Sequence, residues 1–151
     1  MTAPLALTMG EPAGIGGEIA LMAWQKRGQS ALPPFFVIDN PSRLERLATR
    51  LGLSVPLRPI AQPGETSRLF ATSLPVLPIE LAKPSQPGHP DPANAPAVIE
   101  AITKAVALVR SGRTADPARA QSWQPLVDGV RLHAHDGSPD YCPYSKPSSQ
   151  T

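Results

Sequence analysis

The chain opens with a short apolar run that a glycine-rich loop joins to an amphipathic stretch. Residues Leu5–Met9 are apolar apart from one threonine and predict a short buried strand. A helix is predicted next by apolar residues at helical spacing, which are Ile15, Ile19, Met22 and Ala23. The intervening segment Gly10–Glu18 contains four glycines. The start of the chain therefore predicts a strand, a tight turn and the N-terminus of a helix.

The same order of elements is repeated once. Phe35–Ile38 is an apolar run behind two prolines and predicts a second buried strand. Ser42 is expected to cap a helix, because Glu45 three residues later completes the spacing of a capping box. Gly52 is expected to end this helix, whose apolar stripe is Leu44, Leu47, Ala48 and Leu51.

Two weaker extended segments follow. Leu53–Ile60 predicts an edge strand at best, because it contains two prolines. Residues 61–94 are expected to be mostly loop, with one short strand within Leu74–Leu81. The alternation of strands with helices predicts an α/β fold with parallel strands and crossover helices.

The clearest helix of the chain is expected to open at Asn94. Pro96 is tolerated in its first turn, and Gly112 lies just past its end. Its apolar positions fall at helical spacing, and they are Ala95, Val98, Ile99, Ile102, Ala105, Val106 and Val109.

Composition narrows the class of protein. The 151 residues include 14 basic and 12 acidic side chains, and this balance without a basic stripe argues against a nucleic-acid-binding protein. No apolar run is long enough to cross a bilayer, and the N-terminus does not resemble a secretory signal. Cys142 is the single cysteine, which excludes an internal disulfide and fits a reducing compartment, so we expect a cytoplasmic protein.

The glycine loop has two interpretations. Glycines let backbone approach a ligand closely, and the free N–H groups of a helix start suit an anionic group. The alternative is a tight strand-to-helix turn that binds nothing. The run from Leu7 to Gly16, with Glu18, resembles the N-terminal signature of the 4-hydroxythreonine-4-phosphate dehydrogenase family of vitamin B6 biosynthesis. Gly17 departs from the proline that is common in that family.

This resemblance covers about residues 3 to 114 and implies an isocitrate/isopropylmalate-dehydrogenase-like α/β/α domain. It implies oxidation of 4-phosphohydroxy-L-threonine with NAD or NADP to a β-keto acid that decarboxylates, a divalent metal, and a homodimer. By the resemblance, Gly14, Ile15 and Gly16 are expected beside the nicotinamide cofactor, with Glu11 as a polar contact near the cleft. Glu18 is better explained as an acidic residue that interacts favourably with the helix dipole.

The resemblance stops where a core strand should begin, near Ala115. We therefore divide the chain into a dehydrogenase-like part, 1–114, that is an incomplete α/β/α domain, and an irregular tail, 115–151, that is disordered or frame-shifted. The tail has four Leu, Ile or Val residues, too few to form a core. Its candidate metal ligands, His133, His135, Asp136 and Cys142, are better explained as incidental loop residues, because a zinc site needs ordered supporting structure.

We therefore expect an inactive part of the dehydrogenase, with no catalytic residue or metal ligand assigned in this chain. One alternative is a non-catalytic α/β module that binds an anionic ligand or a partner chain. Another is a short enzyme that uses the tail histidines. Among other side chains, His89 is expected in a surface turn and Trp24 in the packing of the first helix. Arg43, Arg46 and Arg50 are expected on a solvated face of the second helix.

Overall fold

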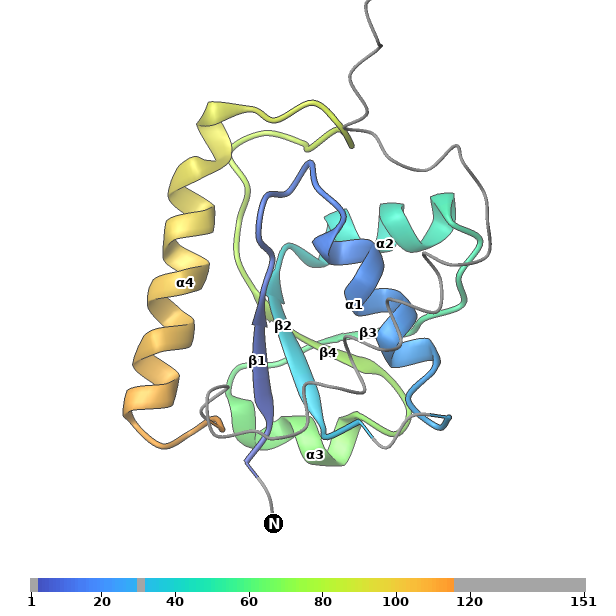
Figure 1. Cartoon of the computed structure of the whole chain (residues 1–151), viewed down its shortest axis with the longest axis vertical. Helices are drawn as coiled ribbons and strands as arrows, with labels where there is room; N and C mark the ends of the chain where they lie inside the picture. Colours follow the sequence, from blue (N-terminus) through green and yellow to red (C-terminus); the bar gives the residue numbers. More distant parts are fainter. Residues whose placement is uncertain (1–2, 30–31, 116–151) are drawn as a thin grey trace, which may run out of the picture.

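The computed structural model describes residues 3–29 and 32–115 and contains one four-stranded sheet (Figure 1). The strand order is β1-β2-β4-β3, and each neighbouring pair is parallel. The strands are β1 (Leu5–Thr8), β2 (Phe35–Asp39), β3 (Leu57–Pro59) and β4 (Leu74–Pro78). The predicted α/β class with parallel strands is confirmed.

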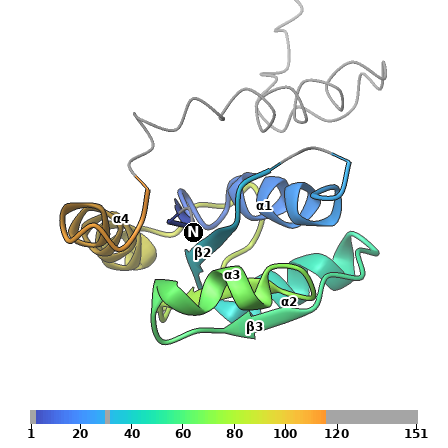
Figure 2. The same ribbon diagram turned by 90° about the horizontal axis from the view of Figure 1, so that it is seen from below.

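Helices cover both faces of this sheet (Figure 2). Helices α1 and α2 pack on one face, and α4 packs on the other. The helices are α1 (Gly16–Gln25), α2 (Pro41–Arg50), α3 (Thr66–Leu69) and α4 (Ala95–Arg110), with single 3-10 turns at η1 (Pro63–Glu65) and η2 (Pro92–Asn94). This part of the chain therefore has the three layers of an α/β/α domain.

Strand β2 lies at the centre of both hydrophobic cores. Phe35 and Val37 point to the core on the α1 and α2 side, whereas Phe36 and Ile38 point to the core on the α4 side. Successive side chains of a strand point to opposite faces, so a strand covered on both faces is apolar throughout. Asp39 is the exception at the end of β2, and it is fully buried.

The one short strand expected between residues 61 and 94 is confirmed, whereas the short helical segments η1 and α3 before it were not predicted. The short strand expected there is present as β4, but it lies inside the sheet between β2 and β3 although it contains Pro75 and Pro78. Alternate residues of a parallel strand bond to opposite neighbours. Val76 is the first residue of β4 that pairs with β2, and it is also the last that pairs with β3, where it lies opposite Pro59. Pro75 lies before the first of these positions and Pro78 after the second, so neither proline removes an N–H donor from a continuing ladder.

The predicted edge strand is confirmed as β3, which pairs only with β4. The predicted cap of the second helix, Ser42, is wrong. Asn40 is the N-cap, its side-chain oxygen accepts a hydrogen bond from Arg43 N, and Pro41 follows at the first helical position. Proline suits that position because its fixed φ is helical and it has no N–H to satisfy.

Glycine ends two helices as the sequence predicts. Gly52 after α2 and Gly112 after α4 have φ of 65° and 69°, in the left-handed region. In each case the glycine N–H and the N–H of the following residue bond back to carbonyls of the last helical turn. This is the Schellman arrangement, in which glycine avoids the strain that a Cβ would cause.

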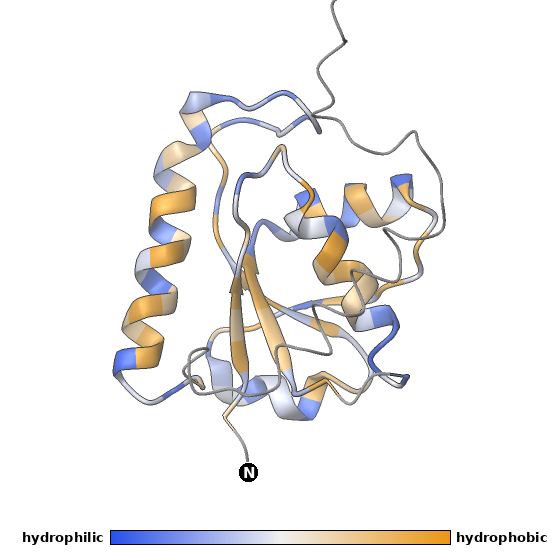
Figure 3. Ribbon diagram, in the orientation of Figure 1, coloured by the Kyte–Doolittle hydropathy of each residue, from blue (hydrophilic) through white to orange (hydrophobic). Residues whose placement is uncertain are grey.

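Helix α4 buries a narrower face than its sequence predicts. Ala97 and Ala101 are its buried residues, and Asn94 is its N-cap. Ile99, Ile102 and Val106 belong to its predicted apolar face, but they are 64%, 50% and 50% exposed. Figure 3 shows the resulting hydrophobic bands along the helix. The structure therefore leaves an apolar stripe on the outside of α4.

Several expectations concern residues outside the described part of the chain. The irregular tail, its disorder or frame shift, and the candidate ligands His133, His135, Asp136 and Cys142 all lie there, so they stay predictions. Within residues 3–29 and 32–115, no helix has the length and apolar character needed to cross a membrane.

Candidate functional site

The candidate site lies where the carboxyl ends of parallel strands β1, β2 and β4 meet. The glycine loop leaves β1 there, Asp39 ends β2, and Ile79 follows β4 with its N–H bonded to the carbonyl of Asp39. Open α/β sheets bind ligands at this edge, because the loops after the strands converge on it. The geometry at this edge is set mainly by three polar side chains.

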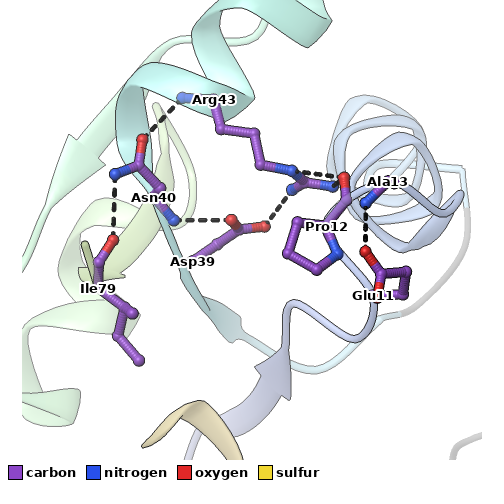
Figure 4. A network of polar contacts seen from close by, with 7 residues as sticks. All are labelled: Glu11, Pro12, Ala13, Asp39, Asn40, Arg43 and Ile79. Carbon is purple, nitrogen blue, oxygen red and sulfur yellow. Dashed lines mark hydrogen bonds and ion pairs between the residues drawn. The ribbon is translucent and has the colours of Figure 1, made fainter. Parts of the chain in front are cut away.

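A buried ion pair connects the end of β2 to the glycine loop (Figure 4). Arg43 Nη1 lies 2.6 Å from Asp39 Oδ2, and both side chains are almost fully buried. Arg43 also donates from Nε and Nη2 to the carbonyl of Pro12, at 3.0 and 2.8 Å. One guanidinium thus binds the strand end and the loop at once, using the planar fork of donors that distinguishes arginine.

Burial raises the pKa of Asp39 from 3.8 to about 6. The positive charge of Arg43 and the hydrogen bond from Asn40 N lower the pKa, but they offset only part of the desolvation. At neutral pH the carboxylate is charged and the ion pair is formed.

Asn40 also holds the end of β2 in place, through bonds to α2 and to the residue that follows β4. Its side-chain oxygen caps α2, and its Nδ2 donates to the carbonyl of Ile79 at 3.1 Å. Because Ile79 follows β4, this side chain joins two neighbouring strand ends and the start of α2 (Figure 4).

The expected solvated face of α2 is only partly correct. Arg46 and Arg50 are exposed, but Arg43 is buried and ion-paired. The charge pattern of the helix does not reveal this, because Asp39 lies outside both the predicted strand and the predicted helix. The spacing of four residues between Asp39 and Arg43 is the available signal, since residues that far apart become neighbours when a helix begins.

Close packing explains two glycines of the loop. A Cβ on Gly16 would lie 2.9 Å from the carbonyl oxygen of Met9, and one on Gly17 would lie 2.9 Å from both Arg43 Nη1 and Leu47 Cδ2. Atoms do not approach that closely. A side chain at residue 16 would require the backbone carbonyl of Met9 to shift, and one at residue 17 would require the ends of the Arg43 and Leu47 side chains to shift. The absent side chain of Gly17 leaves room for the Arg43 guanidinium, at the position where the resembled family commonly has proline.

The predicted cofactor contacts differ in their accessibility. Ile15 is 47% exposed, Gly16 is exposed, and Gly14 is partly buried. Glu11 is exposed, and its carboxylate accepts a hydrogen bond from Ala13 N at 2.9 Å. Glu11 therefore stabilises the turn of the loop itself. Whether any of these residues contacts a cofactor stays a prediction.

A cavity of about 400 Å³ lies beside the loop. One wall is α2, and another is the segment from Ser85 to His89, which the sequence did not connect with the site. Gly88 N donates to the carbonyl of Ala13 at 2.8 Å and so attaches this segment to the glycine loop. The cavity is lined by Pro12, Gly14, Arg43, Arg46, Leu47, Arg50, Ser85, Gln86, Pro87 and His89.

Two expectations about aromatic side chains are confirmed. His89 is exposed in a turn in which its N–H bonds to the carbonyl of Gln86. Trp24 is buried in the packing of α1, where its indole N–H donates to the carbonyl of Phe70 at 2.9 Å and Arg27 stacks on its ring.

The described residues do not fit the divalent metal that the resemblance implies. Within residues 3–29 and 32–115, no group of three or more His, Cys, Asp or Glu side chains is arranged to hold a metal ion. Such a metal would therefore need ligands from outside this part of the chain. A nicotinamide cofactor is compatible with the loop, because Ile15 offers an exposed apolar side chain and Gly14 lies at the cavity wall.

Comparison with known proteins gives a consistent family. No family model matches the chain. A 4-hydroxythreonine-4-phosphate dehydrogenase of Methylorubrum populi is 56% identical over 111 residues, which are 72% of this chain and 32% of that protein. One of Roseobacter denitrificans is 39% identical over 141 residues, 93% of this chain and 40% of that protein. The chain thus spans about a third of the length of the Methylorubrum relatives.

A solved structure shows the same fold. The crystal structure of a 4-hydroxythreonine-4-phosphate dehydrogenase from Klebsiella pneumoniae has a TM-score of 0.64 and 26% identity, and the match covers 76% of this chain and 35% of that one. The Roseobacter match covers more of the chain than residues 3–114 and so includes part of the segment after Ala115. The predicted boundary at 114/115 stays a prediction.

Proposed function

Because this chain matches the N-terminal part of the 4-hydroxythreonine-4-phosphate dehydrogenase family, we propose that it supplies the first strand–loop–helix units of such an enzyme. The observation that carries the proposal is the 56% identity to a curated relative over 111 residues, in a chain whose described part holds the glycine loop and four parallel strands. The enzyme would oxidise the secondary alcohol of 4-phosphohydroxy-L-threonine with NAD or NADP, and the resulting β-keto acid would lose carbon dioxide.

The contribution of this part is to position the cofactor. We place Gly14, Ile15 and Gly16 beside the nicotinamide, which when bound supplies the hydride acceptor. Ile15 would exclude water from one side of the ring, and the Arg43 bonds to Pro12 would keep the loop in one conformation. We assign no catalytic residue to the described part of this chain, and we expect the chain to have no activity when isolated.

A hybrid enzyme tests the proposal directly. Residues 3–114 of this chain would replace the corresponding part of the Methylorubrum populi relative, and NADH or NADPH formation would be followed with 4-phosphohydroxy-L-threonine. We expect the hybrid to be active, the chain alone to be inactive, and Ile15→Asp in the hybrid to raise the KM for the cofactor. The matched control is Ile99→Asp, an exposed isoleucine of α4 away from the loop.

The outcomes separate the possible roles. A folded but inactive hybrid would contradict the dehydrogenase role and leave the non-catalytic α/β module as the better account. Turnover by the isolated chain would contradict its expected inactivity. An equal effect of the two isoleucine variants would contradict the place given to the cofactor.

A further inference from the structure

One face of α2 is turned toward the cavity beside the glycine loop. Arg43, Arg46, Leu47 and Arg50 line it, and their spacing of three, four and seven residues places them on one side of the helix. Two turns of helix therefore contribute three arginines to the lining of the same cavity. Another part of the lining is formed by Ser85, Gln86 and His89.

The three arginines differ in their partners. Arg43 is fully engaged by Asp39 and Pro12. Within the described residues, the side chains of Arg46 and Arg50 make no hydrogen bond or ion pair. Like charges four residues apart on a helix repel each other, so this pair destabilises α2 unless an anion lies between or beside them.

The surroundings of the cavity supply no such anion. None of the described residues that line it is acidic. Glu18 lies near Arg50 across a smaller adjoining cavity of about 180 Å³, but the two side chains form no ion pair. The carboxylate of Asp39 lies behind Arg43 and is already paired.

We propose that this cavity binds the phosphate group of a small molecule, held by Arg46 and Arg50. A guanidinium fork matches two phosphate oxygens at once, and Ser85 and Gln86 add neutral groups that can donate hydrogen bonds. A volume of about 400 Å³ is in the range of small-molecule sites, so it admits a phosphate together with an organic body. The proposal rests on this cavity and not on the proposed dehydrogenase role.

Titration of the full chain with inorganic phosphate tests the site. We expect saturable binding that weakens with added sodium chloride, because exposed charges are screened by salt. Arg46→Gln and Arg50→Gln should each weaken binding about tenfold, since each removes charge-assisted hydrogen bonds. Arg110→Gln is the matched control, because Arg110 is an exposed arginine near the end of α4 and does not line the cavity. It should leave binding unchanged.

Further titrations identify the source of the phosphate. Tighter binding of 4-phosphohydroxy-L-threonine than of inorganic phosphate, with the same dependence on Arg46 and Arg50, would support a phosphorylated substrate. Tighter binding of NAD and NADP alike would support the diphosphate of a dinucleotide, and a preference for NADP would support its ribose phosphate. Inorganic phosphate as the tightest ligand would support a site for the free ion.

The proposal fails if none of these ligands binds saturably. It also fails if the Arg46→Gln, Arg50→Gln double variant binds as the wild type does, or if Arg110→Gln weakens binding equally. Circular dichroism of each variant would show whether its overall helix content matches that of the wild type. An active hybrid enzyme with no phosphate binding would refute this site and leave the proposed function standing.

Discussion

Gly17 and Arg43 occupy one space at the start of α1. The guanidinium of Arg43 lies where a side chain on residue 17 would otherwise be, and its bonds to Asp39 and Pro12 prevent it from moving aside. The buried position of Arg43 therefore depends on the absence of a side chain at residue 17.

Gly17→Ala is expected to destabilise the fold by about 1–3 kcal/mol, the usual cost of adding a methyl group to a filled site. The reason is that the new Cβ would lie 2.9 Å from Arg43 Nη1 and Leu47 Cδ2. Urea unfolding measures the effect. Gly28→Ala is the control, because nothing lies within 4 Å of a Cβ there. Equal stability of the two variants would show that residue 17 has more room than the structure indicates.

Asp39 is expected to make stability depend on pH. Its pKa is raised by burial from 3.8 to about 6, so between these values the folded protein keeps a proton that the unfolded chain releases. The free energy of unfolding due to this group is therefore greatest at low pH, falls as the pH rises through this window and levels off above it.

The comparison with Asp39→Asn isolates this contribution, because asparagine does not titrate. Urea unfolding of both proteins at about pH 4 and about pH 7 should show a wild type whose stability relative to the variant is larger at the lower pH. A difference that grows with pH would mean instead that Arg43 lowers the pKa of the carboxyl.

At the scale of elements, the sequence predicts well those segments whose structure is determined by one strong local signal. Strand β2 is a continuous apolar run, and α2 ends at a glycine with positive φ. Strand β4 is underestimated from sequence, because proline content argues against an interior strand when the register is unknown. Only the pairing shows that Pro75 precedes the first residue paired with β2 and that Pro78 follows the last residue paired with β3.

The candidate site is predictable only where its structure follows from local sequence. The glycine loop follows from local sequence, and its position after β1 is confirmed. The wall formed by Ser85–His89 lies far along the chain from this loop, and the Gly88–Ala13 hydrogen bond that attaches it has no local signal. The burial of Arg43 likewise depends on α1 packing against α2.

At the scale of the molecule, α4 leaves an apolar stripe that the described residues do not cover. Ile99, Ile102 and Val106 are all at least 50% exposed and lie on one side of the helix. Among residues 3–29 and 32–115, strand β1, beside α4, pairs on one edge with β2, and its other edge receives one bond, from Ala115 N to the carbonyl of Pro4. Contiguous exposed apolar surface and an open strand edge both favour association.

We therefore expect this chain to self-associate as its concentration rises. Light scattering with size-exclusion chromatography would measure the mass of the wild type and of the Ile99→Lys, Ile102→Lys double variant. The variant should remain monomeric, since two charges in the stripe cannot be buried against a second copy without partners. Ala107→Lys, on the exposed polar side of α4, should associate as the wild type does. If the double variant associates equally, the contact lies elsewhere, and the open edge of β1 becomes the surface to substitute next.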